Sequence, residues 1–153
     1  ERAETTNDRG YYFDFLEFEK NHQKNNTPST PSISLLYALD SMVSSIMEEG
    51  LENRFRRHSE TNAQVHKWVE ESGFELFAPD GFRSKTLTAV KNNRGIDVPA
   101  FIKAVRERHN LLINGGYGKI KGKTFRISNM GNETLSTMDE LLRALSEVLP
   151  EFT

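Results

Sequence analysis

The spacing of apolar residues changes at Gly73, and this change limits the folds that the chain can adopt. Over 33–50 and again over 51–72, apolar side chains recur every three or four residues, as in helices that each bury one stripe. After Gly73, short runs in which apolar and polar residues alternate are typical of strands. We therefore expect a helical lead-in followed by a domain that mixes strands with helices.

Four strands and two helices are expected after Gly73. The strands are predicted over 74–77, 86–90, 111–113 and 124–128. Asp97 is placed to cap the first of these helices, with Pro99 tolerated in its first turn. The second begins at Leu135 and continues to about Val148. The order β-β-α-β-β-α predicts an α+β fold with a mostly antiparallel sheet.

Some inward-facing positions can be named from the helical spacing. In the helix over 33–50, the apolar residues predict one buried stripe. The residues expected to face inward from the next helix are Phe55, Val65, Trp68 and Val69. The segment 20–32, which is rich in Asn, Pro, Ser and Thr, is expected to be a loop between the aromatic cluster at 11–18 and the first of these helices.

The segment Gly115 to Thr124, GGYGKIKGKT, superficially resembles a phosphate-binding P-loop. A P-loop needs two glycines separated by four residues, then Lys and Ser or Thr at the start of a helix. Counting back from Gly122, the first glycine would stand at the position of Tyr117. The residues that follow alternate as in a strand, so a glycine-rich hairpin is the favoured interpretation.

Composition excludes several functional classes. The chain has no cysteine, so disulfides, thiolate nucleophiles and cysteine-bound zinc are excluded. Twenty basic and 22 acidic residues give a net charge of −2, which is not typical of proteins that bind nucleic acid or anionic membranes. No apolar run approaches the length of a membrane span. We predict no nucleic-acid, membrane or metal partner and a cytoplasmic location.

No side chain is an evident nucleophile or general base. His58 and His66 lie eight residues apart on one expected helix, too far apart to share a metal, and both are interpreted as solvated. The stretches EEGLEN and RFRR carry opposite charges along the same region and are interpreted as a solvated helix face with i,i+4 pairs.

Two features could bind an anion. Thr27 and Thr30 precede a helix whose first N–H groups lack partners within the helix, which suits a phosphate. The alternative is that Thr30 or Ser32 only caps this helix. Arg126 lies between apolar residues of an expected strand, where its guanidinium must find a partner or point to solvent.

Three segments together resemble a known family. TPSTPSISLLYALDSM, EEGLENRFRRH and GGYGKIKGKTFRISNMG are similar to the class V aminotransferases of pyridoxal-phosphate fold type I, in the alanine–glyoxylate and serine–pyruvate branch. The resemblance runs from about Tyr11 to the C-terminus in the same order and spacing. It implies that 51–153 form the small C-terminal α+β domain, and that 1–50 form the tail of the large domain and a connecting helix.

The resemblance also implies an activity and site residues. Amino groups would be transferred between an amino acid such as alanine or serine and a 2-oxo acid such as glyoxylate or pyruvate, with pyridoxal phosphate as the electron sink. Arg126 would bind the α-carboxylate of the substrates, and Thr30 and Thr27 would reach the cofactor phosphate of the partner subunit in a homodimer. The Schiff-base lysine would precede this segment, so the segment alone is expected to be inactive.

Two other classes of function remain open. One is another class V enzyme, such as a lyase; a cysteine desulfurase is disfavoured because the chain has no cysteine. The other is a module without catalytic activity, in which the α+β domain binds a ligand and needs no pyridoxal phosphate.

Overall fold

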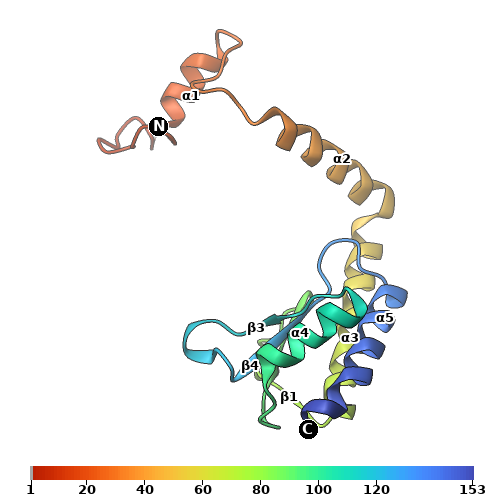
Figure 1. Ribbon diagram of the computed structural model, residues 1–153. Helices are drawn as coiled ribbons and strands as arrows, with labels where there is room; N and C mark the ends of the chain where they lie inside the picture. Colours follow the sequence, from red (N-terminus) through yellow and green to blue (C-terminus); the bar gives the residue numbers. More distant parts are fainter. Residues whose placement is uncertain (1) are drawn as a thin grey trace. The chain divides into compact units, whose positions relative to one another are not determined.

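The computed structural model describes residues 2–153, which divide into two units. The first unit ends at Glu48 and contains α1 (Phe15–His22) and most of α2 (Ile33–Glu49), shown in orange tones in Figure 1. Asp14 caps α1 by accepting a hydrogen bond from the Leu16 backbone N–H at 3.0 Å. The expected loop over 20–32 therefore starts too early, because α1 continues to His22.

The apolar stripe of α2 is present but not buried, contrary to the prediction from its spacing. No residue of α2 is buried, and Leu35 and Leu39 are 69% and 59% exposed. The periodicity specifies which face of a helix is apolar, whereas burial also needs a second surface to cover that face. The sequence therefore predicts the helix correctly and its burial incorrectly.

The second unit, Glu49–Thr153, is a sheet packed against three helices. Its strands pair in the order β1-β2-β4-β3, and every pair is antiparallel. This confirms the predicted α+β fold. In chain order, the elements are α3 (Leu51–Glu71), β1 (Glu75–Leu76), β2 (Leu87–Lys91), α4 (Val98–His109), β3 (Asn114–Gly115), the short 3-10 helix η1 (Gly118–Ile120), β4 (Thr124–Ser128), α5 (Leu135–Val148) and η2 (Leu149–Phe152).

The helices cover one face of this sheet. Helix α5 contacts both α3 and α4 (Figure 1). Along β2 and β4, alternate side chains such as Val90, Phe125 and Ile127 are fully buried in the core with the helices. The intervening residues Ala89 and Arg126 are only half-buried, because they point to the other face. That second face of the sheet carries the candidate site.

Two predictions about burial and pairing in this unit are wrong. The strand expected over 111–113 is displaced, because pairing with β4 begins only at Asn114. Helix α4 ends at its C-cap residue Asn110, which adopts the left-handed conformation with φ 54°. The residues directly after it connect the helix to the sheet and so are not paired as a strand. Phe55 is 64% exposed, whereas Val65, Trp68 and Val69 are buried as predicted. The buried part of α3 starts only at His58.

A buried polar cluster joins α3 to the end of β4. His58 is buried, and its Nδ1 lies 3.0 Å from the Asn129 carbonyl oxygen. The Asn129 amide in turn donates to the His58 carbonyl, to Thr61 Oγ1 and to the Lys85 carbonyl. The interpretation of His58 as solvated is therefore wrong, since the sheet covers this turn of α3. His66 is half-buried, and burial lowers its pKa, with Arg83 and Lys85 adding to the effect.

The charged residues around Gly50 are only partly a solvated face. Glu48, Glu52 and Arg56 are exposed as predicted, whereas Glu49, Arg54 and Arg57 are half-buried and paired with one another. Glu49 accepts hydrogen bonds from Arg54 Nη1 at 3.1 Å and from Arg57 Nε and Nη2 at 2.6 and 2.9 Å. Arg57 Nη1 also donates to the Glu133 carbonyl at 2.6 Å. The predicted i,i+4 pairs are thus replaced by contacts that cross the Gly50 break, where φ is 81°, and reach the loop after β4.

The contacts of Glu49 with Arg54 and Arg57 should make the free energy of unfolding depend on pH in the acid range. Hydrogen bonds from Arg57, and then from Arg54, lower the pKa of Glu49 from 4.5 to about 2. A depressed carboxyl pKa stabilises the folded state above the unfolded pKa, and this contribution is lost as the pH falls through the folded pKa. The stability difference between the unchanged chain and Glu49→Gln should therefore shrink between pH 4.5 and about 2.

Urea unfolding at a series of pH values measures this difference. Glu60→Gln is the matched control, because Glu60 is exposed and lies on α3, the helix that carries Arg54 and Arg57, so its effect should be small at every pH. A Glu49→Gln effect that stays constant down to pH 2 would contradict the assignment.

Candidate functional site

Arg126 lies in the middle of β4, between β2 and β3. Its Cα partners are Ala89 on β2 and Asn114 on β3. Its neighbours Phe125 and Ile127 are completely buried, so alternation directs the guanidinium to the face of the sheet that the helices leave open. The strand was predicted correctly over 124–128, and with it the position of Arg126 among apolar neighbours.

The guanidinium of Arg126 is held at two points. Its Nε donates to the Gly115 carbonyl at 3.0 Å, and its Cζ lies 4.4 Å from the centroid of the Tyr117 ring. Within residues 2–153, no carboxylate forms an ion pair with Arg126, and neither Nη atom makes a hydrogen bond. The terminal N–H groups can therefore donate to an external anion, and a planar carboxylate matches their geometry.

The glycine segment is a hairpin connection, as predicted, and not a P-loop. Strand β4 follows it directly, and the only helical turn within it is η1. A Cβ on Gly116 would lie 2.2 Å from Thr124 Oγ1 and 2.5 Å from the Ile120 carbonyl oxygen. The Gly116 N–H donates to the Thr124 carbonyl at 2.9 Å. The glycine is thus required by close packing of the loop on itself.

Thr27 and Thr30 belong to the first unit, in the segment between α1 and α2. Both side chains are exposed. Among the hydrogen bonds of residues 2–153, none involves either hydroxyl, and neither Thr30 nor Ser32 accepts a helix N–H through its side chain. The two hydroxyls are therefore available to an oxygen-rich ligand such as a phosphate.

The lysines do not resemble a reactive amine. All nine lysine side chains are exposed. Lys91 pairs with Glu75 at 2.5 Å, and Lys67 lies 3.7 Å from Glu71. A lysine that forms a Schiff base is activated by an apolar pocket or by a neighbouring cation. The exposed positions seen here lack such a pocket.

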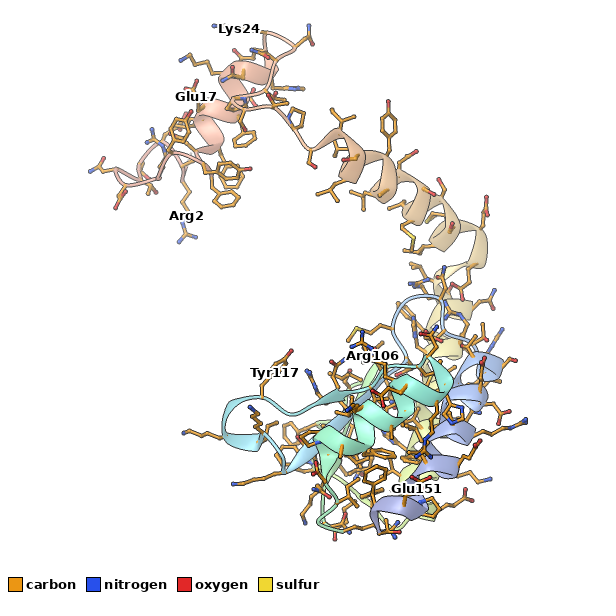
Figure 2. All side chains as sticks on the ribbon, in the orientation of Figure 1. Arg2, Glu17, Lys24, Arg106, Tyr117 and Glu151 are labelled. Carbon is orange, nitrogen blue, oxygen red and sulfur yellow. The ribbon has the colours of Figure 1, made fainter. Side chains whose placement is uncertain are left out.

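Tyr117 is the site residue that the sequence did not reveal. In the sequence, Tyr117 stands out only as the residue that interrupts the P-loop pattern, whereas in the structure the Arg126 Cζ lies over its ring. Figure 2 shows its side chain standing out from the loop after β3. The sequence does show an aromatic residue in a hairpin loop several residues before an arginine. Whether the two side chains meet can be decided only when the register of β3 against β4 is known.

Two known proteins that are similar to this chain belong to one class of enzyme. No protein-family model matches the chain. It is 37% identical over 144 residues to an uncharacterized aminotransferase of Methanocaldococcus jannaschii, covering 91% of this chain and 37% of the relative. It is 33% identical over 122 residues to a serine–glyoxylate aminotransferase of Methylorubrum extorquens, covering 79% and 30%. Both relatives are aminotransferases.

The solved structures give the same result. A crystal structure of an alanine–glyoxylate aminotransferase from Nostoc sp. superposes with a TM-score of 0.84 and 31% identity, over 95% of this chain and 39% of that one. The chain belongs to the family of alanine–glyoxylate and serine–glyoxylate aminotransferases. It spans about a third of the length of the curated relatives named above.

Proposed function

We propose that this chain carries the substrate-carboxylate anchor of a pyridoxal-phosphate-dependent aminotransferase. The observation that carries the proposal is the Arg126 guanidinium, fixed by Gly115 and Tyr117, with its terminal N–H groups free of protein partners within residues 2–153. The reaction would move an amino group between an amino acid of the alanine or serine type and a 2-oxo acid of the glyoxylate or pyruvate type. The names of the relatives include serine, alanine and glyoxylate as substrates.

Arg126 would act by binding and orientation. Amino acid and 2-oxo acid both carry a carboxylate next to the reacting carbon, so one anchor serves both directions of transfer. A guanidinium donates two parallel hydrogen bonds to a carboxylate and thereby fixes its plane. Since Nε is already bonded to Gly115, the two Nη atoms are the donors left for the substrate. Holding the carboxylate in one plane orients the bond at the reacting carbon.

The chain's hydroxyls fit one part of the cofactor. Bound pyridoxal phosphate would supply the electron sink for the reaction. Thr30 and Thr27 are exposed and free of side-chain hydrogen bonds in the described segment, which supports a role in binding the phosphate of the partner subunit's cofactor. Because all nine lysines are exposed, we assign the reacting amine to residues outside this chain.

The domain assignment and assembly belong to the same proposal. Residues 51–153 would be the small C-terminal domain of a class V, fold type I enzyme, and 1–50 would be the tail of the large domain and a connecting helix, in a cytoplasmic homodimer. The exposed aromatic residues Tyr11, Phe13 and Phe15 support burial of this region against another surface. Sedimentation equilibrium that gives a monomer mass for the complete enzyme would refute the homodimer.

A transamination assay tests the activity. The complete enzyme should transfer amino groups from alanine or serine to glyoxylate, or from serine to pyruvate, with the new amino acid and the new oxo acid formed in equal amounts. Release of ammonia without a new amino acid would indicate a lyase. Binding of a carboxylate with no turnover of any of these pairs would indicate a module without catalytic activity.

A trapping experiment tests the absence of a reactive lysine in this chain. Incubated with pyridoxal phosphate and then borohydride, the 153-residue chain should be labelled weakly and at several exposed lysines, because none is placed to react preferentially. Peptide mass spectrometry measures the distribution of the label. Stoichiometric labelling of one lysine would contradict the assignment of the reacting amine to other residues.

A further inference from the structure

The loop after β3 fixes the position of Tyr117 through the backbone. Gly115 pairs with Phe125 in the sheet, and the next residue, Gly116, donates its N–H to Thr124. On the other side, the Tyr117 carbonyl accepts the Ile120 N–H at 3.0 Å. The residues on both sides of Tyr117 are thus tied down, so the side chain projects from a defined point of the loop.

Tyr117 is too exposed to be a core residue. Its side chain is 74% exposed, yet its ring lies 4.4 Å from the Arg126 Cζ. An aromatic ring that serves packing alone is normally covered by other apolar side chains. Among the residues that the structure describes, Tyr117 has no aromatic contact, and its one ring interaction is with the guanidinium. We therefore connect the position of the Tyr117 ring with Arg126 and not with packing of the core.

Together, the ring contact and the Gly115 hydrogen bond restrict how the arginine can present its donors. The Arg126 Cζ lies over the Tyr117 ring, and the hydrogen bond from Nε to the Gly115 carbonyl restricts rotation of the guanidinium. The edge that carries both Nη atoms remains uncovered by any hydrogen-bond partner of the described chain. A flexible arginine side chain loses conformational entropy when it binds a ligand, whereas an arginine that is already oriented loses less.

We infer that Tyr117 is a positioning residue that orients Arg126 for the carboxylate of the substrate. This inference rests on the proposed role of Arg126 as the carboxylate anchor and adds a second residue to it. The stack, and not the tyrosine hydroxyl, carries the effect, because the interaction is between the ring face and the cation. Phenylalanine should replace Tyr117, and alanine should not.

The first measurement is the kinetics of the complete enzyme that contains this chain. Tyr117→Ala should raise KM for alanine and for glyoxylate together by about threefold to tenfold, as expected for loss of an exposed cation–π contact and of orientation. Tyr117→Phe should stay within about twofold of the unchanged enzyme. Lys119→Ala is the matched control, since Lys119 is exposed on the same loop and makes no ring contact with Arg126.

The second measurement does not depend on activity. In the NMR spectrum of the 153-residue chain, the ring should shift the Arg126 side-chain resonances upfield, and Tyr117→Ala should abolish this shift while Tyr117→Phe retains it. If Arg126→Ala raises KM but Tyr117→Ala leaves KM within about twofold, the positioning role is wrong and the proposed function stands. If Arg126→Ala leaves KM unchanged, both fail. A loss in Tyr117→Phe equal to that in Tyr117→Ala would overturn the stacking argument.

Discussion

Arg126→Ala should raise KM for the amino acid and for the 2-oxo acid alike by about tenfold to a hundredfold in the complete enzyme. Hydrogen bonds to charged groups contribute roughly 1.5 to 3 kcal/mol, and about 1.4 kcal/mol corresponds to tenfold. Because the same carboxylate is held in both directions of transfer, both constants should change. The rate of the chemical step should fall as well, since the reacting bond is no longer oriented. Steady-state kinetics with both substrates measures these effects.

Two variants serve as controls for Arg126→Ala. Arg126→Lys keeps the charge but not the planar pair of donors, so it should recover only part of the loss. Arg94→Ala removes an arginine that also stacks on an aromatic ring, with its Cζ 5.4 Å from Phe74, and that also donates to a carbonyl, that of Ser72. It should leave both constants unchanged. KM values within about twofold in Arg126→Ala, well below the tenfold that 1.4 kcal/mol represents, would make Arg126 an ordinary strand residue.

Phe125→Ala should destabilise the second unit by about 3 to 5 kcal/mol, the usual cost of removing a fully buried phenylalanine. Phe125 is completely buried, with ring centroids 5.2 Å from Phe74 and 5.9 Å from Phe101. It is also the immediate neighbour of Arg126, on the opposite face of β4. Loss of this packing would loosen the strand that carries the site. Urea unfolding followed by circular dichroism measures the change.

Phe82→Ala is the matched control for this experiment. Phe82 is 83% exposed, so its removal should change the free energy of unfolding by less than about 0.5 kcal/mol. A Phe125→Ala variant whose stability is as close to the unchanged chain as that of Phe82→Ala would show that β4 is not part of the core.

The parts of the fold that depend on local signals could be predicted from the sequence. The alternation at 124–128 gives the bounds of β4. Asp97 caps α4 as expected, accepting the Ala100 N–H at 3.0 Å. The spacing of leucines from Leu135 gives α5, with Leu145 and Val148 completely buried. In each case, a few consecutive residues determine the structure.

The parts that depend on distant residues could not be predicted. His58 is buried because Asn129, 71 residues away in the chain, lies against it. Arg57 is held by Glu49 and by the Glu133 carbonyl, so its neighbours in sequence do not reveal its role. The contact between Tyr117 and Arg126 likewise requires the register of β3 against β4, and β3 itself was predicted too early in the chain.

The role of Arg126 as the carboxylate anchor is tested most directly by a crystal structure of the complete enzyme with a 2-oxo acid such as pyruvate or glyoxylate bound. The two carboxylate oxygens should accept hydrogen bonds from the two Nη atoms of Arg126, at about 2.7 to 2.9 Å as in charge-assisted pairs. The Nε bond to Gly115 and the stack on Tyr117 should remain in place. A carboxylate bound by other residues, with both Nη atoms of Arg126 in solvent, would contradict the role of Arg126 as the carboxylate anchor.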